Sequence, residues 1–178
     1  MKKILLSFFV LSALALTGCS TNYSVKYTEP YSEFSRGATF EVGTVTDTSG
    51  FDLEKAEGVN LTKEFTEKLK QALEKEGLLG TEYRLNVRIT QYAPGNAAAR
   101  WFLTVTPRHS TATTIMKTWT KVVNSSGEEV ADLDVERVIG AGGLASIGAW
   151  RTVIDDVAVA TVQSLKEELA KQKDAKKE

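Results

Sequence analysis

The segment with the clearest potential for ligand chemistry is VERVIGAGGLASIGAW, residues 135–150. Gly140, Gly142 and Gly143 stand between an expected strand and an expected helix, a context in which backbone N–H groups can surround the phosphates of a nucleotide. A dinucleotide fold also needs a second parallel strand with an acidic residue about twenty positions after the glycines. Here 38 residues follow Gly140, and they hold one expected helix and a charged tail. The segment also lacks the Gly-Lys-Ser/Thr that binds a β-phosphate.

The strand before these glycines gives a further argument against a nucleotide site. A strand in a parallel sheet is buried on both faces and is nearly all apolar, whereas DLDVERVI alternates apolar with charged residues. We therefore expect no bound nucleotide, and we interpret residues 140–148 as a mobile loop or a partner contact. Leu144 and Ile147 are then exposed, or docked between the expected hairpin and the last helix.

The other residue types assemble no catalytic or metal site. Ser-His-Asp chemistry would have to use His109, the single histidine. Structural zinc needs several Cys and His ligands at short spacings, and the Asp-rich loop that binds calcium is absent. Asp132, Asp134 and Glu136 alternate along an expected strand, which is typical of a solvated strand face. We expect a non-enzymatic protein with no catalytic residue, metal or cofactor.

Cys19 is the only cysteine, and LTGC, residues 16–19, resembles the bacterial lipobox. It follows MKK and an apolar run over residues 4–16, which is typical of a secretory signal. A helix of that length spans roughly 20 Å and cannot cross a bilayer core of roughly 30 Å. The resemblance implies cleavage between Gly18 and Cys19 and covalent lipid, a diacylglycerol, on the Cys19 sulfur. Each buried methylene contributes about 0.8 kcal/mol, so two or three acyl chains anchor a protein permanently.

Charge and the residue after the cysteine indicate where the protein acts. An Asp there would mark retention in the inner membrane, so Ser20 favours the outer membrane, on its periplasmic face. Without Lys2 and Lys3, 20 basic and 23 acidic side chains remain, a formal net charge of −3. This balance gives no basic footprint for nucleic acid. The expected partners are the membrane, through the lipid anchor, and another envelope protein.

The chain divides into four parts. Residues 1–18 are the signal peptide, and residues 19–38 are interpreted as the lipidated N-terminus and a flexible tether, because they are polar and carry Pro30. Tyr23, Tyr27, Tyr31 and Phe34 recur there near helical spacing, so they either form a partner-binding stripe or dock on the domain. Residues 39–170 form one globular α+β domain, and residues 171–178 are a charged, frayed tail.

Periodicity predicts the elements of the domain. The domain begins at TFEVGTVTD, which predicts a strand, and TSGFDLEKAEG then interrupts the strand pattern with turn residues. VNLTKEFTEKLKQALEKEG predicts a helix with Asn60 as N-cap and Gly77 as its C-terminal stop. Its apolar face consists of Leu61, Phe65, Leu69, Ala72 and Leu73.

The sequence pattern in the second half of the domain predicts a sheet and a final helix. EYRLNVRITQY alternates strictly, and residues 113–123 and 130–139 read as a hairpin around NSSG. Residues 150–170 have helical periodicity, with Asp155 and Asp156 as charges favourable to the helix dipole. Short turns between strands favour an antiparallel sheet of about four strands. We expect a two-layer α+β fold with two helices on one face, in the order β-α-β-β-β-α.

Together, the lipobox, EYRLNVRITQYAPGNAAARWF, the NSSGEEV turn and VIGAGGLASIG resemble bacterial envelope lipoproteins of domain-of-unknown-function family 4410. The resemblance covers residues 38–170, and its most specific parts are Gly95-Asn96, Arg100-Trp101 and the late glycines. It departs from the family in LTVTPRHSTATT, where the family often has glycines after Arg-Trp. The resemblance implies an envelope location, no established activity, and Arg100 and Trp101 as loop or partner contacts.

Three functions remain open at this point. The leading hypothesis is an accessory or regulatory lipoprotein that binds another envelope component, because the anchor is present and no catalytic set is assembled. The second is a carrier of a small apolar or glycan ligand, suggested by Trp101, Trp119 and Trp150. The third is an envelope hydrolase that uses His109.

Overall fold

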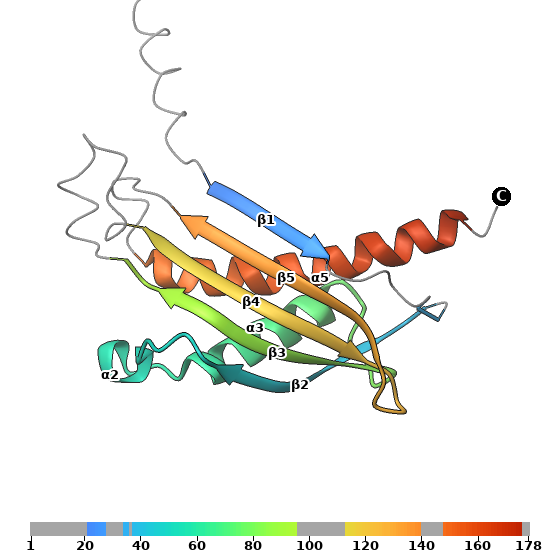
Figure 1. Cartoon of the computed structure of the whole chain (residues 1–178), viewed down its shortest axis with the longest axis horizontal. Helices are drawn as coiled ribbons and strands as arrows, with labels where there is room; N and C mark the ends of the chain where they lie inside the picture. Colours follow the sequence, from blue (N-terminus) through green and yellow to red (C-terminus); the bar gives the residue numbers. More distant parts are fainter. Residues whose placement is uncertain (1–20, 28–33, 36, 96–112, 140–147, 176–178) are drawn as a thin grey trace, which may run out of the picture.

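The computed structural model describes residues 21–27, 34–35, 37–95, 113–139 and 148–175 (Figure 1). Within them the elements are β1 (Thr21–Tyr27), β2 (Phe40–Asp47), α2 (Leu53–Glu57), α3 (Leu61–Lys75), β3 (Tyr83–Ala93), β4 (Thr114–Val123), β5 (Glu129–Ile139) and α5 (Ala149–Ala175).

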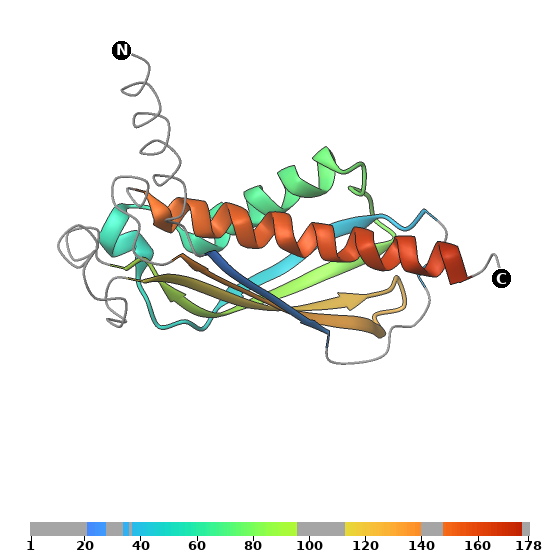
Figure 2. The same ribbon diagram turned by 90° about the horizontal axis from the view of Figure 1, so that it is seen from above.

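The strands form one sheet in the order β1-β5-β4-β3-β2, and α3 and α5 pack side by side against one face of it (Figures 1 and 2). This confirms the two-layer α+β class and the order β-α-β-β-β-α from β2 to α5. The sheet is mixed, however, because β2 and β3 are parallel while the other neighbours are antiparallel. The helix α3 carries the chain back along the sheet before β3 begins, and such a crossover makes a parallel pair.

Helix α3 forms as its sequence predicts. The Asn60 side chain accepts a hydrogen bond from the Lys63 backbone N–H at 3.0 Å, which satisfies one free donor of the first turn. Gly77, with φ of 68°, follows the last turn in a left-handed conformation that suits glycine. The five apolar residues of the predicted face are all buried.

Helix α2 was not expected, because its region reads as turn residues. Its N-cap is Asp52, whose carboxylate accepts from the Lys55 N–H at 2.9 Å, and Gly58 ends it with φ of 69°. Only Leu53 among its helical residues is buried. A helix of this length has too few apolar positions to show a period, so its caps are the only local signal.

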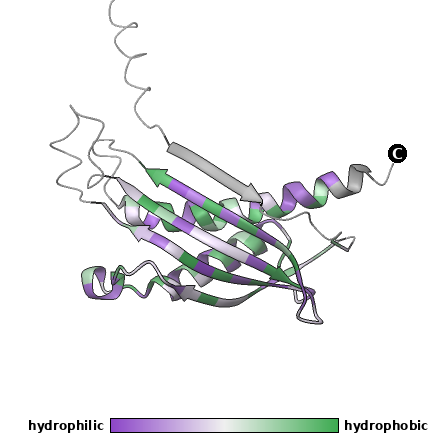
Figure 3. Cartoon of the chain, in the orientation of Figure 1, coloured by the Kyte–Doolittle hydropathy of each residue, from purple (hydrophilic) through white to green (hydrophobic). Residues whose placement is uncertain are grey.

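Hydrophobic and hydrophilic residues alternate along the strands (Figure 3). The burial pattern follows this alternation, with buried side chains under the helices and more exposed, mostly polar ones on the other face of the sheet, here called the open face. Along β4, for example, every second residue from Thr114 to Val122 is buried. The buried hydrophobic residues of the sheet are Phe40, Tyr83, Leu85, Val87, Ile89, Tyr92, Met116, Val122, Ala131, Leu133 and Val135.

The expected flexible tether over residues 19–38 is wrong for the residues described there. Thr21–Tyr27 is a strand at the edge of the sheet, paired with β5 from Thr21 with Ile139 to Tyr27 with Leu133. Phe34 is 4% exposed and packs edge-on against Phe40 and Tyr83, with ring centroids 5.6 and 5.2 Å apart. The free edge of β5 supplies the backbone hydrogen-bond partners of β1. These partners are distant in sequence, so the short segment by itself does not show that a strand forms there.

Helix α5 also departs from expectation at both ends. Its first turn contains no acidic residue, so Asp155 and Asp156 do not act on the helix dipole there. They make ion pairs instead, Asp155 with Lys68 of α3 at 3.5 Å and Asp156 with Arg137 of β5 at 2.8 Å. The helix continues to Ala175, so residues 171–175 are not a frayed tail.

A polar contact near the end of α3 also joins the two long helices. Glu76 accepts hydrogen bonds from Lys166 at 2.5 Å and from Gln163 at 3.0 Å, both on α5. The hydrogen bond from Lys166 is the main reason why the pKa of Glu76 is lowered. The contact therefore links the two helices at the surface of the domain.

Two valines on α5 allow a matched test of this packing. Val157 is fully buried and Val159 is 41% exposed. We expect Val157→Ala to lower the free energy of unfolding by about 2–3 kcal/mol, through lost apolar burial and the cavity left behind. Val159→Ala should change the free energy of unfolding by no more than about 0.5 kcal/mol, because the side chain is exposed. Both variants gain the same helix propensity, so the difference between them reports burial. Equal losses in urea unfolding would contradict this placement of α5.

Candidate functional site

The residues singled out by sequence lie mostly outside the described part of the chain. These are Gly18, Cys19, Arg100, Trp101, His109, Gly140, Gly142, Gly143, Leu144 and Ile147. Of residues 140–148 only Gly148 is described, with φ of 79° directly before α5. Its carbonyl accepts hydrogen bonds from Arg151 and Thr152, at 2.9 and 3.3 Å, so this glycine begins the helix.

The described residues that gather chemistry lie on the open face of the sheet, around Trp119. Trp119 is on β4, directly opposite Arg88 of β3 on one side and Asp134 of β5 on the other. It belongs to the alternate set of β4 that is only half-buried. Opposed residues on neighbouring strands present their side chains to the same face. Three strands of the sheet therefore position one cluster.

Trp119 has charged groups on its ring and at its N–H. The Arg88 guanidinium lies 5.1 Å from the ring centroid and the Lys121 ammonium lies 4.6 Å from it, both in cation–π geometry. The indole Nε1–H donates to Asp132 Oδ2 at 2.9 Å. These contacts hold the indole in a fixed position on the open face.

Asp132 differs from the expected solvated carboxylate. Its residue is 7% exposed, whereas Asp134 and Glu136 are half-buried. One oxygen accepts from Trp119, and the other, Oδ1, has no hydrogen-bond partner within the described residues. A buried acceptor without a partner costs about 1–3 kcal/mol. Oδ1 has almost no accessible surface, so a further donor could reach it only if neighbouring side chains moved aside.

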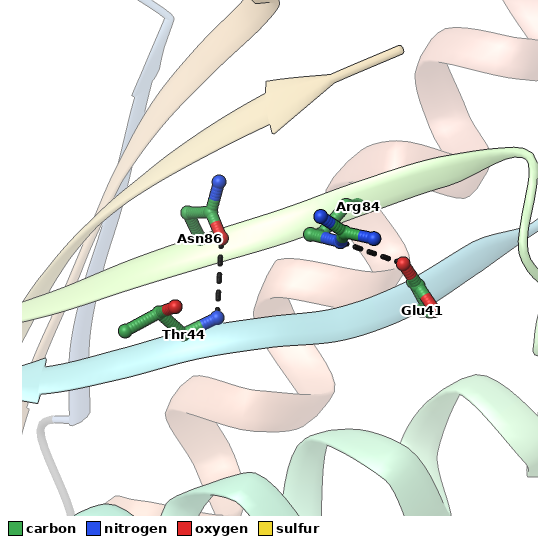
Figure 4. A network of polar contacts seen from close by, with 4 residues as sticks. All are labelled: Glu41, Thr44, Arg84 and Asn86. Atoms are coloured by element: carbon green, nitrogen blue, oxygen red, sulfur yellow. Dashed lines mark hydrogen bonds and ion pairs between the residues drawn. The ribbon is translucent and has the colours of Figure 1, made fainter. Parts of the chain in front are cut away.

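At the β2 side, the open face is bordered by a polar network (Figure 4). Arg84 donates to Glu41 at 2.6 Å, and the Thr44 backbone N–H donates to Asn86 Oδ1 at 3.1 Å. Between them the pairing of β2 with β3 is irregular at Gly43. A Cβ on Gly43 would lie 2.4 Å from Asn86 Oδ1 and 2.5 Å from Arg84 Cγ. Glycine is thus required for these two side chains to lie across β2.

Charge is arranged in columns along the strands of this face. Arg84 and Arg88 lie on β3, and Lys117 and Lys121 on β4, while Asp132, Asp134 and Glu136 occupy β5. Trp and Arg are among the residue types that most often carry binding energy in protein interfaces. The arrangement favours recognition of another protein over bond-breaking chemistry.

The second described tryptophan, Trp150, lies on the other side of the sheet. It begins α5 and packs against the core, and its carbonyl accepts a hydrogen bond from the Tyr92 hydroxyl at 3.4 Å. Burial, with a smaller contribution from Glu57, raises the pKa of Tyr92 above its ordinary value. Trp119 and Trp150 therefore do not form one ring platform of the kind that binds a glycan.

Among the described residues, no group of three His, Cys, Asp or Glu side chains could hold a metal ion. In the same part of the chain, no helix has the length and apolar character that crossing a membrane requires.

Compared by sequence, the chain matches no protein-family model and no curated protein. The resemblance to family 4410 therefore stays a prediction. Among solved structures, the chain of the PelC dodecamer from Paraburkholderia phytofirmans is similar, with a TM-score of 0.50 and 12% identity over 78% of this chain and 96% of that one. This likeness shows a shared fold.

Two other bacterial structures show weaker likeness. A candidate lipoprotein from Caulobacter crescentus has a TM-score of 0.42 and 14% identity, covering 77% of this chain and 91% of that chain. A protein from Xanthomonas campestris assigned to family DUF330 has a TM-score of 0.48 and 11% identity, covering 78% and 88%.

Sequence reasoning missed the cluster around Trp119, although its signal was present. The alternation in EYRLNVRITQY places Arg84, Asn86 and Arg88 on one face of a strand. The alternation in residues 130–139 does the same for Asp132, Asp134 and Glu136. The pairing register of the hairpin would have placed Trp119 between the two sets.

The Trp119–Asp132 contact can be tested by paired substitutions. Trp119→Phe removes the N–H and leaves the Asp132 carboxylate buried without a donor, so we expect a loss of about 1–3 kcal/mol in unfolding free energy. Adding Asp132→Leu removes the unpaired carboxylate and should recover part of that loss. Strictly additive effects of the two substitutions in urea unfolding would show that the side chains are not coupled.

Proposed function

We propose that the protein is a non-enzymatic lipoprotein of the bacterial outer membrane, anchored through Cys19 on the periplasmic face. In this proposal its domain is an accessory or regulatory module that binds another envelope protein. The observation that supports the binding role is the open face. There Trp119 of β4 lies between the basic residues of β3 and the acidic residues of β5, next to the buried carboxylate of Asp132. The lipobox supports the anchor.

The binding surface follows from the one-sided packing of the domain. The helices α3 and α5 cover one face, so the described strands present Trp119 and its charged neighbours to the surroundings on the other. Arg88 and Trp119 are of the residue types that are enriched at energetic centres of interfaces. A partner with both acidic and basic groups would complement the two columns.

A second copy of the chain is one candidate for this partner. The fold neighbour PelC is a dodecamer, which supports self-association here as a form of the same proposal. The alternative role, a carrier of a small apolar or glycan ligand, has no observation in its favour, because the two described tryptophans lie on opposite sides of the sheet. The envelope hydrolase depends on His109, which lies outside the described residues.

The anchor makes a direct prediction. Cys19→Ser should abolish incorporation of radiolabelled palmitate and release the protein from the membrane fraction, because no other cysteine can carry diacylglycerol. Ser20→Ala serves as the matched control and should leave labelling unchanged. Continued labelling of the Cys19→Ser protein, or its retention in membranes, would contradict the proposed anchor.

The proposed binding surface makes a second prediction. A photo-crosslinking amino acid at Lys117, on the open face, should form a specific adduct in intact cells, whereas the same group at exposed Lys70 of α3 should not. Trp119→Ala should reduce the Lys117 adduct, since the interface loses its central aromatic side chain. Mass spectrometry of the adduct distinguishes a second copy from another envelope protein. Equal adducts from both positions would count against the open face.

A further inference from the structure

Strand β1 begins almost directly after the proposed site of lipidation. Cys19 precedes Thr21 by two residues, and two residues span at most about 7 Å. Thr21 itself pairs with Ile139, the last residue of β5. If Cys19 is acylated, as in the function proposed above, the chain has too little length to let the sheet move far from the lipid surface.

The register of the sheet determines which part of the domain is held there. Ile139 also pairs with Thr114 at the start of β4, and Ala93 at the end of β3 pairs with Ile115 next to it. We call this the Thr21 end of the sheet. The N-terminal end of α5 lies at the same end (Figures 1 and 2).

The described side chains at this end suit a membrane surface. Ile115, Val138 and Ile139 are partly exposed, and Trp150 lies at the start of α5 with part of its surface accessible. Exposed Arg151 places its guanidinium 4.7 Å from the Trp150 ring centroid. An amphipathic indole beside a cation is favourable where apolar lipid meets anionic or zwitterionic headgroups.

The opposite end of the sheet has different chemistry. The turn between β4 and β5 consists of polar or small residues, and Ser125, Glu128 and Glu129 are exposed. From Thr114 to Val123 the strand extends about 30 Å. Exposed carboxylates also lie at the Thr21 end, at α2 (Asp52, Glu54 and Glu57; Figure 1), so the two ends differ in the partly exposed indole of Trp150 and in distance from Cys19 rather than in charge.

From the spacing and the register together, we propose that the Thr21 end of the domain faces the lipid bilayer, with Trp150 and Arg151 at the headgroup surface. The strands then run away from the membrane, and the β4–β5 turn is the most distant part of the sheet. The open face stands upright beside the bilayer, where it is accessible from the side.

The orientation can be measured with single thiols, because acylation consumes the only native one. Thr152→Cys labels the exposed first turn of α5, and Ser125→Cys labels the distant turn. Each lipidated protein, carrying a bimane fluorophore, is reconstituted into vesicles of phosphatidylethanolamine and phosphatidylglycerol that contain headgroup-nitroxide lipid. We expect several-fold stronger quenching at position 152 than at position 125. Equal or reversed quenching in protein that floats with the vesicles would overturn the orientation.

Two controls separate the orientation from the anchor. Protein that fails to float with the vesicles would contradict lipidation itself, and with it both proposals. Inserting about ten Gly and Ser residues between Ser20 and Thr21 gives a connection long enough for the domain to move away. We expect this insertion to lower the quenching at position 152 in floating protein. Unchanged quenching would overturn the inference that the short connection sets the orientation.

Discussion

The structure depends on burying one face of a single sheet under two helices. This one-sided burial requires each strand to alternate, and it fixes the register, since a shift by one residue would exchange the two faces. Met116 and Val122 lie in the core for the same reason that Trp119 lies on the open face. The position of the candidate site is therefore a consequence of the core. No loop has to fold correctly for Arg88, Trp119 and Asp132 to meet.

The parts of the fold that could be predicted are those whose periodic signal is local. Helix α3 shows both caps and its full apolar face in the sequence, and the β4–β5 hairpin shows alternation on either side of a turn. Helix α2 is too short for a period. Strand β1 forms only because β5 has a free edge, and the parallel pairing of β2 with β3 depends on where α3 packs. Both features depend on contacts between residues that are distant in sequence.

The candidate site was less predictable than the fold, for a physical reason. Its residues come from β3, β4 and β5, and their proximity follows from cross-strand pairing rather than from spacing along one segment. The sequence places Asp132 in a solvated series, whereas in the structure it is buried and accepts a hydrogen bond from the Trp119 indole across the hairpin. Lipidation of Cys19 is predicted from a contiguous motif and stays a prediction, because Cys19 lies outside the described residues. Arg100 and Trp101 lie outside the described residues.

In the proposed function, the pairing of β1 connects the lipid on Cys19 to the open face. A flexible tether would let the domain rotate freely, whereas an edge strand that begins two residues after an acylated Cys19 would transmit the position of the lipid directly to the sheet. Trp119 lies five residues along β4 from Thr114, which is about 17 Å from the Thr21 end. In the proposed orientation, a partner that reaches Trp119 must extend that far from the bilayer and approach sideways. A neighbouring copy lipidated on the same membrane would meet both conditions, because its anchor would restrict its approach to the plane of the membrane, and so would a membrane-anchored envelope protein.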